Sequence, residues 1–339
     1  MSSKPGIENW QSFQKQVFAL ISERYSSKQQ MVLDLEELLG LQQAVVYDRI
    51  ALKRMLPLSE CFILLRHYQI TSKVISQLWT NKVLVNYTPL DQVPTSLEEY
   101  LIPLRDNMQA LALTGGLHLY YAANELPFYH YYRQPRIALF KYFVWHMLSW
   151  KQGDAPDLTF DRDYIDQHLT RLEPIFQEIV SLYTQFSSTE VWHTNILHNT
   201  LHQIHYLFQI GLLPDAALAH ELFEDLEEIL NSLELMAKQG HKEEHPEHTF
   251  HLYHNEIVHT NNMALATAPG VSHVFFAFDN PNIMYANDSK LGDYSLHYFE
   301  RLISHADNLS TSSNKSRALY FKDNKDQIKM MKKQYADFK

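Results

Sequence analysis

Hydrophobic residues recur every three or four positions along most of this chain, which is the spacing of amphipathic helices. Residues 7–25 show the pattern first, with Trp10, Phe13 and Val17 on one face. Between residues 96 and 239 the same period continues with short polar breaks, which predicts antiparallel helices. The predicted helices cover residues 7–25, 72–80, 97–112, 137–150, 161–186, 189–212 and 215–238.

The pattern changes near the C-terminal end. Residues 249–258, 262–268 and 271–278 are rich in β-branched and aromatic side chains and predict three strands. The last of these is apolar on both faces, so we expect it at the centre of a small sheet. Helical spacing returns at residues 288–307 and 321–336, which completes a small α+β arrangement.

Residues 33–68 have the pattern of a helix-turn-helix followed by a supporting helix. Asp34 is a predicted N-cap, and Gly40 supplies the left-handed backbone that ends the first helix. The second helix has an apolar face to bury, made of Val46, Ile50 and Leu52. Its polar positions suit base edges and phosphates, and they are Gln42, Gln43, Tyr47, Arg49, Lys53 and Arg54.

This stretch resembles the lambda-repressor-like helix-turn-helix family. The likeness is to a branch of bacterial regulators whose second helix carries a Tyr-x-Arg-Ile pattern, here Tyr47 to Ile50. The resemblance implies that four side chains enter the major groove of double-stranded DNA: Gln42, Gln43, Tyr47 and Arg49. Asp48 departs from the family pattern, which carries a second arginine at that position.

The C-terminal region resembles the same regulators in two places. One is the Tyr-His-Asn-Glu-Ile element at residues 253–257, and the other is a serine-rich loop with Lys-x-Arg at residues 310–317. Hydroxyls and two cations give this loop the composition of an effector or anion site, formed by Ser312, Ser313, Lys315 and Arg317. The alternative is an ordinary surface loop.

These patterns together predict a mainly α fold in three parts. We expect a helix-turn-helix DNA-binding bundle at residues 1–82, an antiparallel helical domain at 95–240 and a small α+β domain at 249–339. A chain of 339 residues has room for two or three cores.

Charge and composition restrict the function further. The net charge is −10, but residues 1–90 balance at +3 and the remainder at −13, so only the front of the chain suits a polyanion. A single cysteine, Cys61, excludes an internal disulfide framework. There is no apolar run long enough to span a membrane and no signal-peptide pattern, so we expect a cytoplasmic protein.

Histidines offer a different kind of site. On the predicted helix 189–212 they recur at spacings of four and three, as His198, His202 and His205. Imidazoles on one helical face can bind zinc or iron, although the glutamate of a metalloprotease HExxH motif is missing. A second group is predicted to be a solvated loop entering a strand: His241, His245, His248, His251 and His254 with Glu243, Glu244 and Glu247.

Our main hypothesis is a DNA-binding transcriptional regulator that dimerises and responds to a small-molecule or protein effector through its C-terminal regions. No nucleophile motif or paired carboxylate stands out, so we expect neither an enzyme nor a cofactor. Two alternatives stay open. One is a metal-binding helical enzyme or sensor that uses the His198 helix, and the other is a protein-interaction scaffold whose acidic helix 215–238 docks a basic partner.

Overall fold

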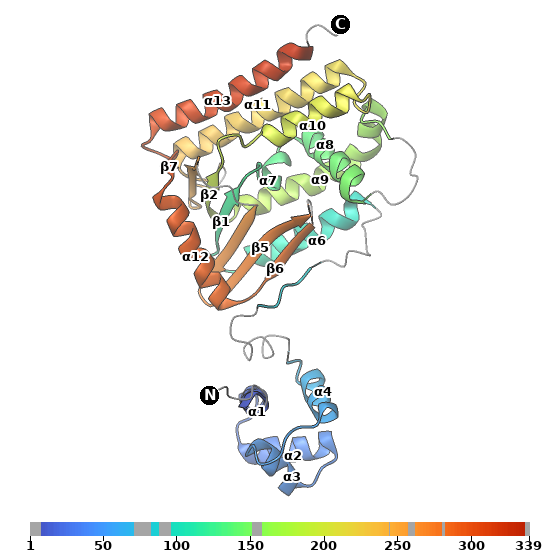
Figure 1. Ribbon diagram of the computed structural model, residues 1–339, viewed down its shortest axis with the longest axis vertical. Helices are drawn as coiled ribbons and strands as arrows, with labels where there is room; N and C mark the ends of the chain where they lie inside the picture. Colours follow the sequence, from blue (N-terminus) through green and yellow to red (C-terminus); the bar gives the residue numbers. More distant parts are fainter. Residues whose placement is uncertain are drawn as a thin grey trace, which may run out of the picture. The chain divides into compact units, whose positions relative to one another are not determined.

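The computed structural model describes residues 8–70, 83–87, 96–150, 158–243, 245–256, 262–279 and 282–335. It divides into two compact units, Met1–Leu84 (unit 1) and Val85–Lys339 (unit 2) (Figure 1). The predicted helix at residues 72–80 lies outside the described residues.

Unit 1 is a small helical bundle. Its helices are α1 (Glu8–Ser22), α2 (Lys28–Leu39), α3 (Gln43–Ile50) and α4 (Leu58–His67). Their apolar faces meet in one core, which contains Val17, Phe18, Ile21, Met31, Val32, Leu35, Val46, Leu56, Leu64 and Tyr68. The turn between α2 and α3 is as predicted, because Gly40 adopts the left-handed conformation with φ 64°.

The start of α2 differs from the prediction. The side-chain oxygen of Ser27 accepts a hydrogen bond from the backbone N–H of Gln30 at 3.2 Å, so Ser27 is the N-cap and Asp34 lies inside the helix. The buried residues Met31 and Val32 show why the helix begins so early, since an extra turn places both side chains in the core. The helix α2, which the sequence predicts to be short, therefore has 12 residues.

Unit 2 is built on a seven-stranded mixed sheet in the order β6-β5-β4-β1-β2-β3-β7. The strands are β1 (His118–Ala123), β2 (Ser187–Trp192), β3 (Phe250–His254), β4 (Met263–Ala268), β5 (Val271–Asp279), β6 (Asn282–Ala286) and β7 (Asp307–Asn308). β1, β2 and β3 are parallel, and the other strands pair antiparallel to their neighbours.

This sheet shows that the mainly α prediction is wrong. β1 and β2 lie in the segment that was predicted to be entirely helical, and the C-terminal strands β3 and β4 pair directly with them. The helical middle and the α+β end are thus parts of one α/β architecture. β1 occupies the central position, whereas β5, predicted to be central, is one strand from the edge.

The misread segment is the predicted helix 189–212. Its first residues form β2, and helix α10 begins only at His198. β2 is buried on both faces, so its side chains show none of the alternation that marks a half-exposed strand. A short buried strand with mixed polar and apolar residues, followed closely by a helix, then resembles one longer helix in sequence.

The helices divide unequally between the two faces of the sheet (Figure 1). One large core joins the sheet to α6 (Leu97–Ala112), α7 (Phe128–Tyr131), α8 (Pro135–Trp145), η1 (His146–Trp150), α9 (Arg162–Thr184), α10 (His198–Gln209), α11 (Ala216–Gln239) and α13 (Asn314–Tyr335). α12 (Ser289–Ser304) packs on the other face through Phe299 and Leu302. α8 is buried along its length, as its nearly all-round apolar sequence predicts.

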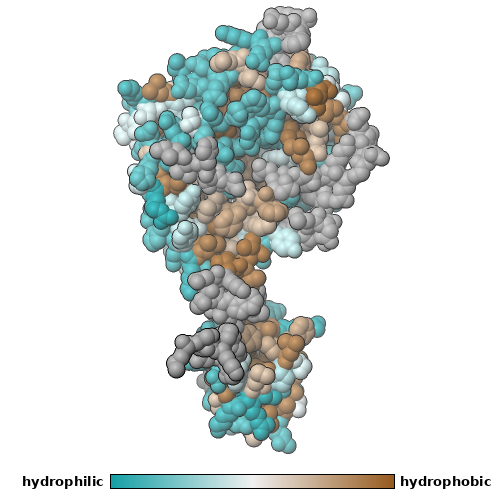
Figure 2. Space-filling model, viewed as in Figure 1, coloured by the Kyte–Doolittle hydropathy of each residue, from teal (hydrophilic) through white to brown (hydrophobic). Residues whose placement is uncertain are grey.

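The surface of unit 2 includes an apolar region over the β5–β6 hairpin (Figure 2). Phe278 and Tyr285 are both exposed there. The edge strand β6 is partly covered, because the backbone N–H of Asn86 donates to the Tyr285 carbonyl at 2.7 Å and the Tyr285 N–H donates back at 2.9 Å. Among the described helices, none combines the length and hydropathy that a membrane span requires.

Candidate nucleic-acid interface

The turn between α2 and α3 leaves the first residues of α3 accessible. The N–H of Gly40 donates to the Glu36 carbonyl, which ends α2, and α3 begins at Gln43. Val46 is buried and fixes the orientation of the helix, so Gln42, Gln43 and Tyr47 are exposed. Three predicted contact residues therefore form one polar and aromatic surface at the start of α3.

Arg49 lies apart from this surface. Its Nε and Nη2 each lie 3.0 Å from a carboxylate oxygen of Glu60 on α4, a bidentate pair. Its Nη1 donates to the Met55 carbonyl, and only 13% of the Arg49 side chain is exposed. The geometry makes Arg49 a brace that joins α3 to α4 and to the loop between them.

Gln14 on α1 fixes the other side of the same loop. Its side-chain N–H2 donates to the carbonyls of Arg49 and Arg54, and its Oε1 accepts the N–H of Leu56 at 2.8 Å. Gln14 is buried, so these bonds are shielded from water. Together, Gln14 and Arg49 hold the C-terminal end of α3 from two sides.

The two remaining predicted contact residues follow α3. Lys53 is exposed, and Arg54 lies with its Nε 3.3 Å from an oxygen of Asp48. Both side chains of this pair are accessible to water, and such surface ion pairs contribute little free energy. The Arg54 guanidinium can therefore leave Asp48 for another anion at little cost in free energy.

A cavity of about 360 Å³ opens beside the N-terminal end of α2. Its lining includes the cations Lys15 and Lys28 and the hydroxyls of Ser22, Ser26 and Ser27. The partial positive charge of a helix N-terminus and its free N–H groups favour anions.

The cavity lies beside α3, because the Lys28 Nζ is 5.7 Å from the centre of the Tyr47 ring. The sequence prediction missed Lys28 because it placed the start of α2 too far along the chain. The unnoticed signal was the Ser-Ser-Lys run at residues 26–28, an N-cap followed by a cation.

Among the described residues, the histidines of α10 belong to no group of three converging ligand atoms. The His198 and His202 rings are tilted by 55° to each other with their centres 4.3 Å apart, and His205 follows on the same helix. Within the part of the chain that the structure describes, one group brings three ligand atoms within 4.8 Å of one another: His245, Glu247 and His248. That group belongs to the loop that the sequence predicts to be solvated.

The serine-rich loop uses its arginine internally. Arg317 is buried, and its guanidinium donates to the carbonyls of Leu309 and Thr311 at 3.1 and 3.2 Å. Ser312 and Lys315 remain accessible. The loop therefore presents one of its two predicted cations to solvent.

A buried polar cluster, absent from the sequence predictions, lies between the sheet and the helices of unit 2. Glu190 on β2 is fully buried, and its carboxylate accepts four hydrogen bonds. The donors are Tyr183 Oη at 2.6 Å, Trp192 Nε1 at 2.9 Å, His130 Nε2 at 3.0 Å and Tyr129 Oη at 3.2 Å. Burial alone would raise the pKa of Glu190, but the neighbouring His130, followed by Lys242 and the Tyr183 hydroxyl, holds it at about 2.

The two basic side chains of this cluster, His130 and Lys242, are also fully buried. Burial lowers the pKa of His130, which keeps its imidazole neutral, and lowers the pKa of Lys242 well below its ordinary value. The Lys242 Nζ lies 3.2 Å from the centre of the Tyr183 ring and has no hydrogen-bond acceptor among the described residues. An isolated glutamate in a strand gives no sequence signal for such a cluster, since its donors come from α7, α9 and β2.

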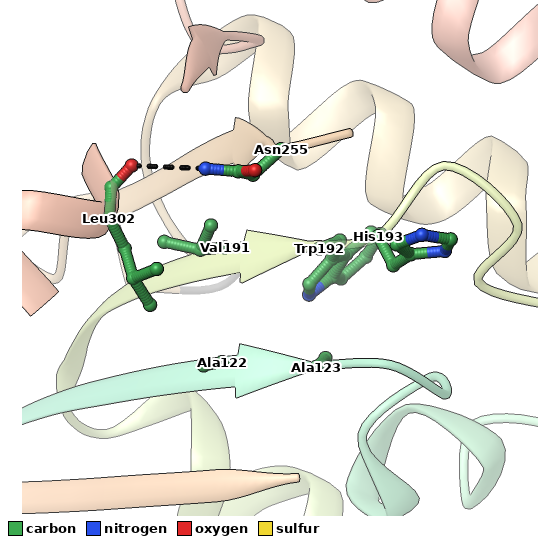
Figure 3. A pocket seen from close by; sticks show the side chains of 7 residues that line it. All are labelled: Ala122, Ala123, Val191, Trp192, His193, Asn255 and Leu302. Atoms are coloured by element: carbon green, nitrogen blue, oxygen red, sulfur yellow. Dashed lines mark hydrogen bonds between the residues drawn. The ribbon is translucent and has the colours of Figure 1, made fainter. Parts of the chain in front are cut away.

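A small cavity of about 10 Å³ lies where β1 and β2 end (Figure 3). Asn255 closes one side, and its Nδ2 donates to the Leu302 carbonyl at 3.3 Å. The carboxyl ends of parallel strands are the usual ligand position in open α/β sheets. This volume corresponds to one water molecule, so the cavity has no room for an organic effector.

Comparisons with known proteins give no assignment. No family model, no curated protein and no solved structure matches the chain.

Proposed function

We propose that this protein is a DNA-binding transcriptional regulator that reads double-stranded DNA with α3. The observation that carries the proposal is the exposed start of α3, with Gln42, Gln43 and Tyr47 beside the cationic N-terminus of α2. A helix held by Arg49 and Gln14 while its other end is free has the preorganisation that base reading requires.

The side chains divide into readers, phosphate contacts and braces. Gln42 and Gln43 suit bidentate hydrogen bonds to adenine, and Tyr47 suits apolar contact with base edges. Three cations suit phosphates: Lys28, Lys53 and Arg54. Arg49, predicted from sequence to contact DNA, is assigned instead a positioning role because its guanidinium is engaged by Glu60.

The proposal extends to assembly and regulation. One short helix contacts few base pairs, so we propose a homodimer that brings two copies of unit 1 to two half-sites. Unit 2 is proposed to supply dimer contacts and to bind an effector, without catalysing a reaction. The protein then acts in the cytoplasm, where bacterial DNA is accessible.

Fluorescence-anisotropy titration tests the proposal with the full chain and fragments of its own upstream DNA at several salt concentrations. We expect binding that weakens as salt rises, with Gln43→Ala losing about 1–3 kcal/mol of preference for the best fragment. Gln11→Ala is the matched control, because Gln11 is an exposed glutamine on α1.

A second pair of variants tests the phosphate contacts. Lys28→Ala is expected to weaken binding to every fragment and to reduce the salt slope by about one. Arg66→Ala removes the same charge from an exposed position on α4 and serves as its control. Salt-independent binding, or equal losses in the test and control variants, would contradict the proposed function.

A further inference from the structure

The loop between α11 and β3 carries three metal-binding side chains close together. His245 Nδ1 lies 3.0 Å from Glu247 Oε1, and His248 Nε2 lies 3.8 Å from the same oxygen. All three ligand atoms lie within 4.8 Å of one another. Ligands of a tetrahedral zinc ion at about 2.1 Å stand about 3.4 Å apart, so small side-chain rotations complete the geometry.

The backbone holds these three residues in place. The N–H of His248 donates to the His245 carbonyl at 2.9 Å, and the N–H of Lys242 donates to the His248 carbonyl at 2.9 Å. An antiparallel bridge between His241 and Thr249 closes the base of the loop. The ligands therefore sit on one closed turn and not on separate flexible segments.

The loop is also anchored to the core of unit 2. Glu243 pairs with Arg133 on the loop after α7, at 2.7 Å, and accepts a hydrogen bond from Ser232 on α11. Lys242 extends into the buried cluster around Glu190. A rigid support of this kind reduces the entropy cost of ordering the ligands when a metal ion binds.

We infer that His245, Glu247 and His248 form a binding site for a divalent transition-metal ion of the zinc class. Two imidazoles and one carboxylate are a ligand set that zinc accepts, and they leave a fourth position for water. The side chains of His245 and His248 are about one third exposed, so the ion can enter from solvent. This site is independent of the proposed DNA contacts, which lie in unit 1.

The test uses the full-length chain, stripped with a chelator and titrated with Co²⁺ and then Zn²⁺. We expect one ion per chain, a Co²⁺ absorption spectrum of tetrahedral type, and displacement of Co²⁺ by Zn²⁺. Zinc at about 100 times its Kd should raise the Tm of unit 2 by about 5–10 °C. His248→Ala and Glu247→Gln should each weaken binding by roughly 100-fold or more, following the sensitivity of metal sites to their ligand shells.

Two control variants separate this site from the other histidines. His297→Ala removes an imidazole that is hydrogen-bonded to Glu300 at 3.1 Å and belongs to no three-ligand group among the described residues. His202→Ala removes one ring of the neighbouring His198–His202 pair on α10. Neither control should change the Co²⁺ affinity.

Unchanged affinity in His248→Ala would overturn the inference, as would loss in His202→Ala or absence of any stoichiometric site. The metal-free variants should keep the wild-type Tm, because the three side chains are accessible to water and the loop is held by backbone hydrogen bonds. If His248→Ala lowers the metal-free Tm, Glu247→Gln still tests the site without a change in stability. The Glu247 side chain is more exposed than that of His248, and glutamine is nearly the same size as glutamate.

Discussion

The two units each hold a carboxylate with several hydrogen bonds, but they use it differently. In unit 1, Glu60 pairs with Arg49 near the surface and joins α3 to α4. In unit 2, Glu190 is fully buried and accepts four hydrogen bonds from side chains of α7, α9 and β2. The first arrangement positions one element, whereas the second ties the sheet to its helical layer.

The difference in burial between the two carboxylates predicts a difference in the unfolding free energy that is lost when each interaction is removed. A carboxylate that loses its partner where it is partly exposed is rehydrated only in part, whereas donors left behind in a dry core have no water to replace the lost acceptor. Unit 2 should therefore be the more sensitive to loss of its polar centre, although its apolar core is much larger.

Replacement of Glu190 should have the largest effect. Glu190→Ala removes the acceptor shared by four buried donors, of which the Tyr183 hydroxyl keeps the Ser188 hydroxyl at 3.2 Å, and is expected to cost unit 2 about 3–5 kcal/mol of unfolding free energy. Urea unfolding with hydrogen exchange at β2 peptides measures this loss separately from unit 1. Glu300→Ala, at an exposed glutamate of α12, is the control. A loss of unfolding free energy below about 1 kcal/mol in Glu190→Ala would contradict the greater sensitivity expected of unit 2.

Breaking the brace in unit 1 should have a smaller effect. Arg49→Ala and Glu60→Ala are each expected to cost unit 1 about 2–4 kcal/mol, since only 13% and 14% of the two side chains are exposed. The double variant should cost little more than either single one, because the same interaction is removed. Hydrogen exchange at α3 peptides provides the measurement.

The same variants distinguish a positioning role for Arg49 from direct contact between Arg49 and DNA bases. If Arg49 is a brace, Arg49→Ala weakens binding to all DNA fragments in proportion to the loss of folded unit 1. If stability is unchanged and only the preference among fragments is lost, Arg49 contacts bases and the positioning role assigned here is wrong.

Unit 1 was the easier unit to predict because its signals are local. Gly40 marks the left-handed turn and Val46 marks a buried helical position, and both lie where the sequence placed them. The role of Arg49 was beyond sequence reasoning, since an arginine on a polar face looks the same whether it meets Glu60 or a phosphate. The early start of α2 was missed because its serine cap precedes a polar first turn.

Unit 2 was mispredicted because its sheet depends on contacts between distant segments. β1 and β2 pair in parallel although β2 follows β1 by more than two helices, and such pairing has no local turn signal. The hairpin strands β4, β5 and β6 differ in this respect, because short connections along the sequence join each one to the next. Glu190 and Lys242 reach one cluster from separate strands and loops, so neither residue stands out in the sequence.

The effect expected to be smallest near neutral pH is a pH dependence of the stability of unit 2. Burial, followed by the charges of His251 and Lys242, lowers the pKa of His118 to about 4. An unfolded histidine titrates near pH 6.5, so between about pH 6.5 and 4 the unfolded chain binds the proton that the folded chain refuses. His118 should thus make unit 2 less stable as pH falls, by up to about 1.4 kcal/mol per pH unit.

His118→Gln isolates this contribution, because an amide does not titrate and can still bond the Thr189 hydroxyl that His118 Nε2 meets at 2.8 Å. Urea unfolding between pH 7 and 4 should give a flatter stability profile for the variant in β1 and β2 peptides. The α3 peptides of unit 1 should respond to pH equally in both proteins. Parallel profiles for the two proteins in unit 2 would mean that His118 is protonated as readily in the folded sheet as in the unfolded chain.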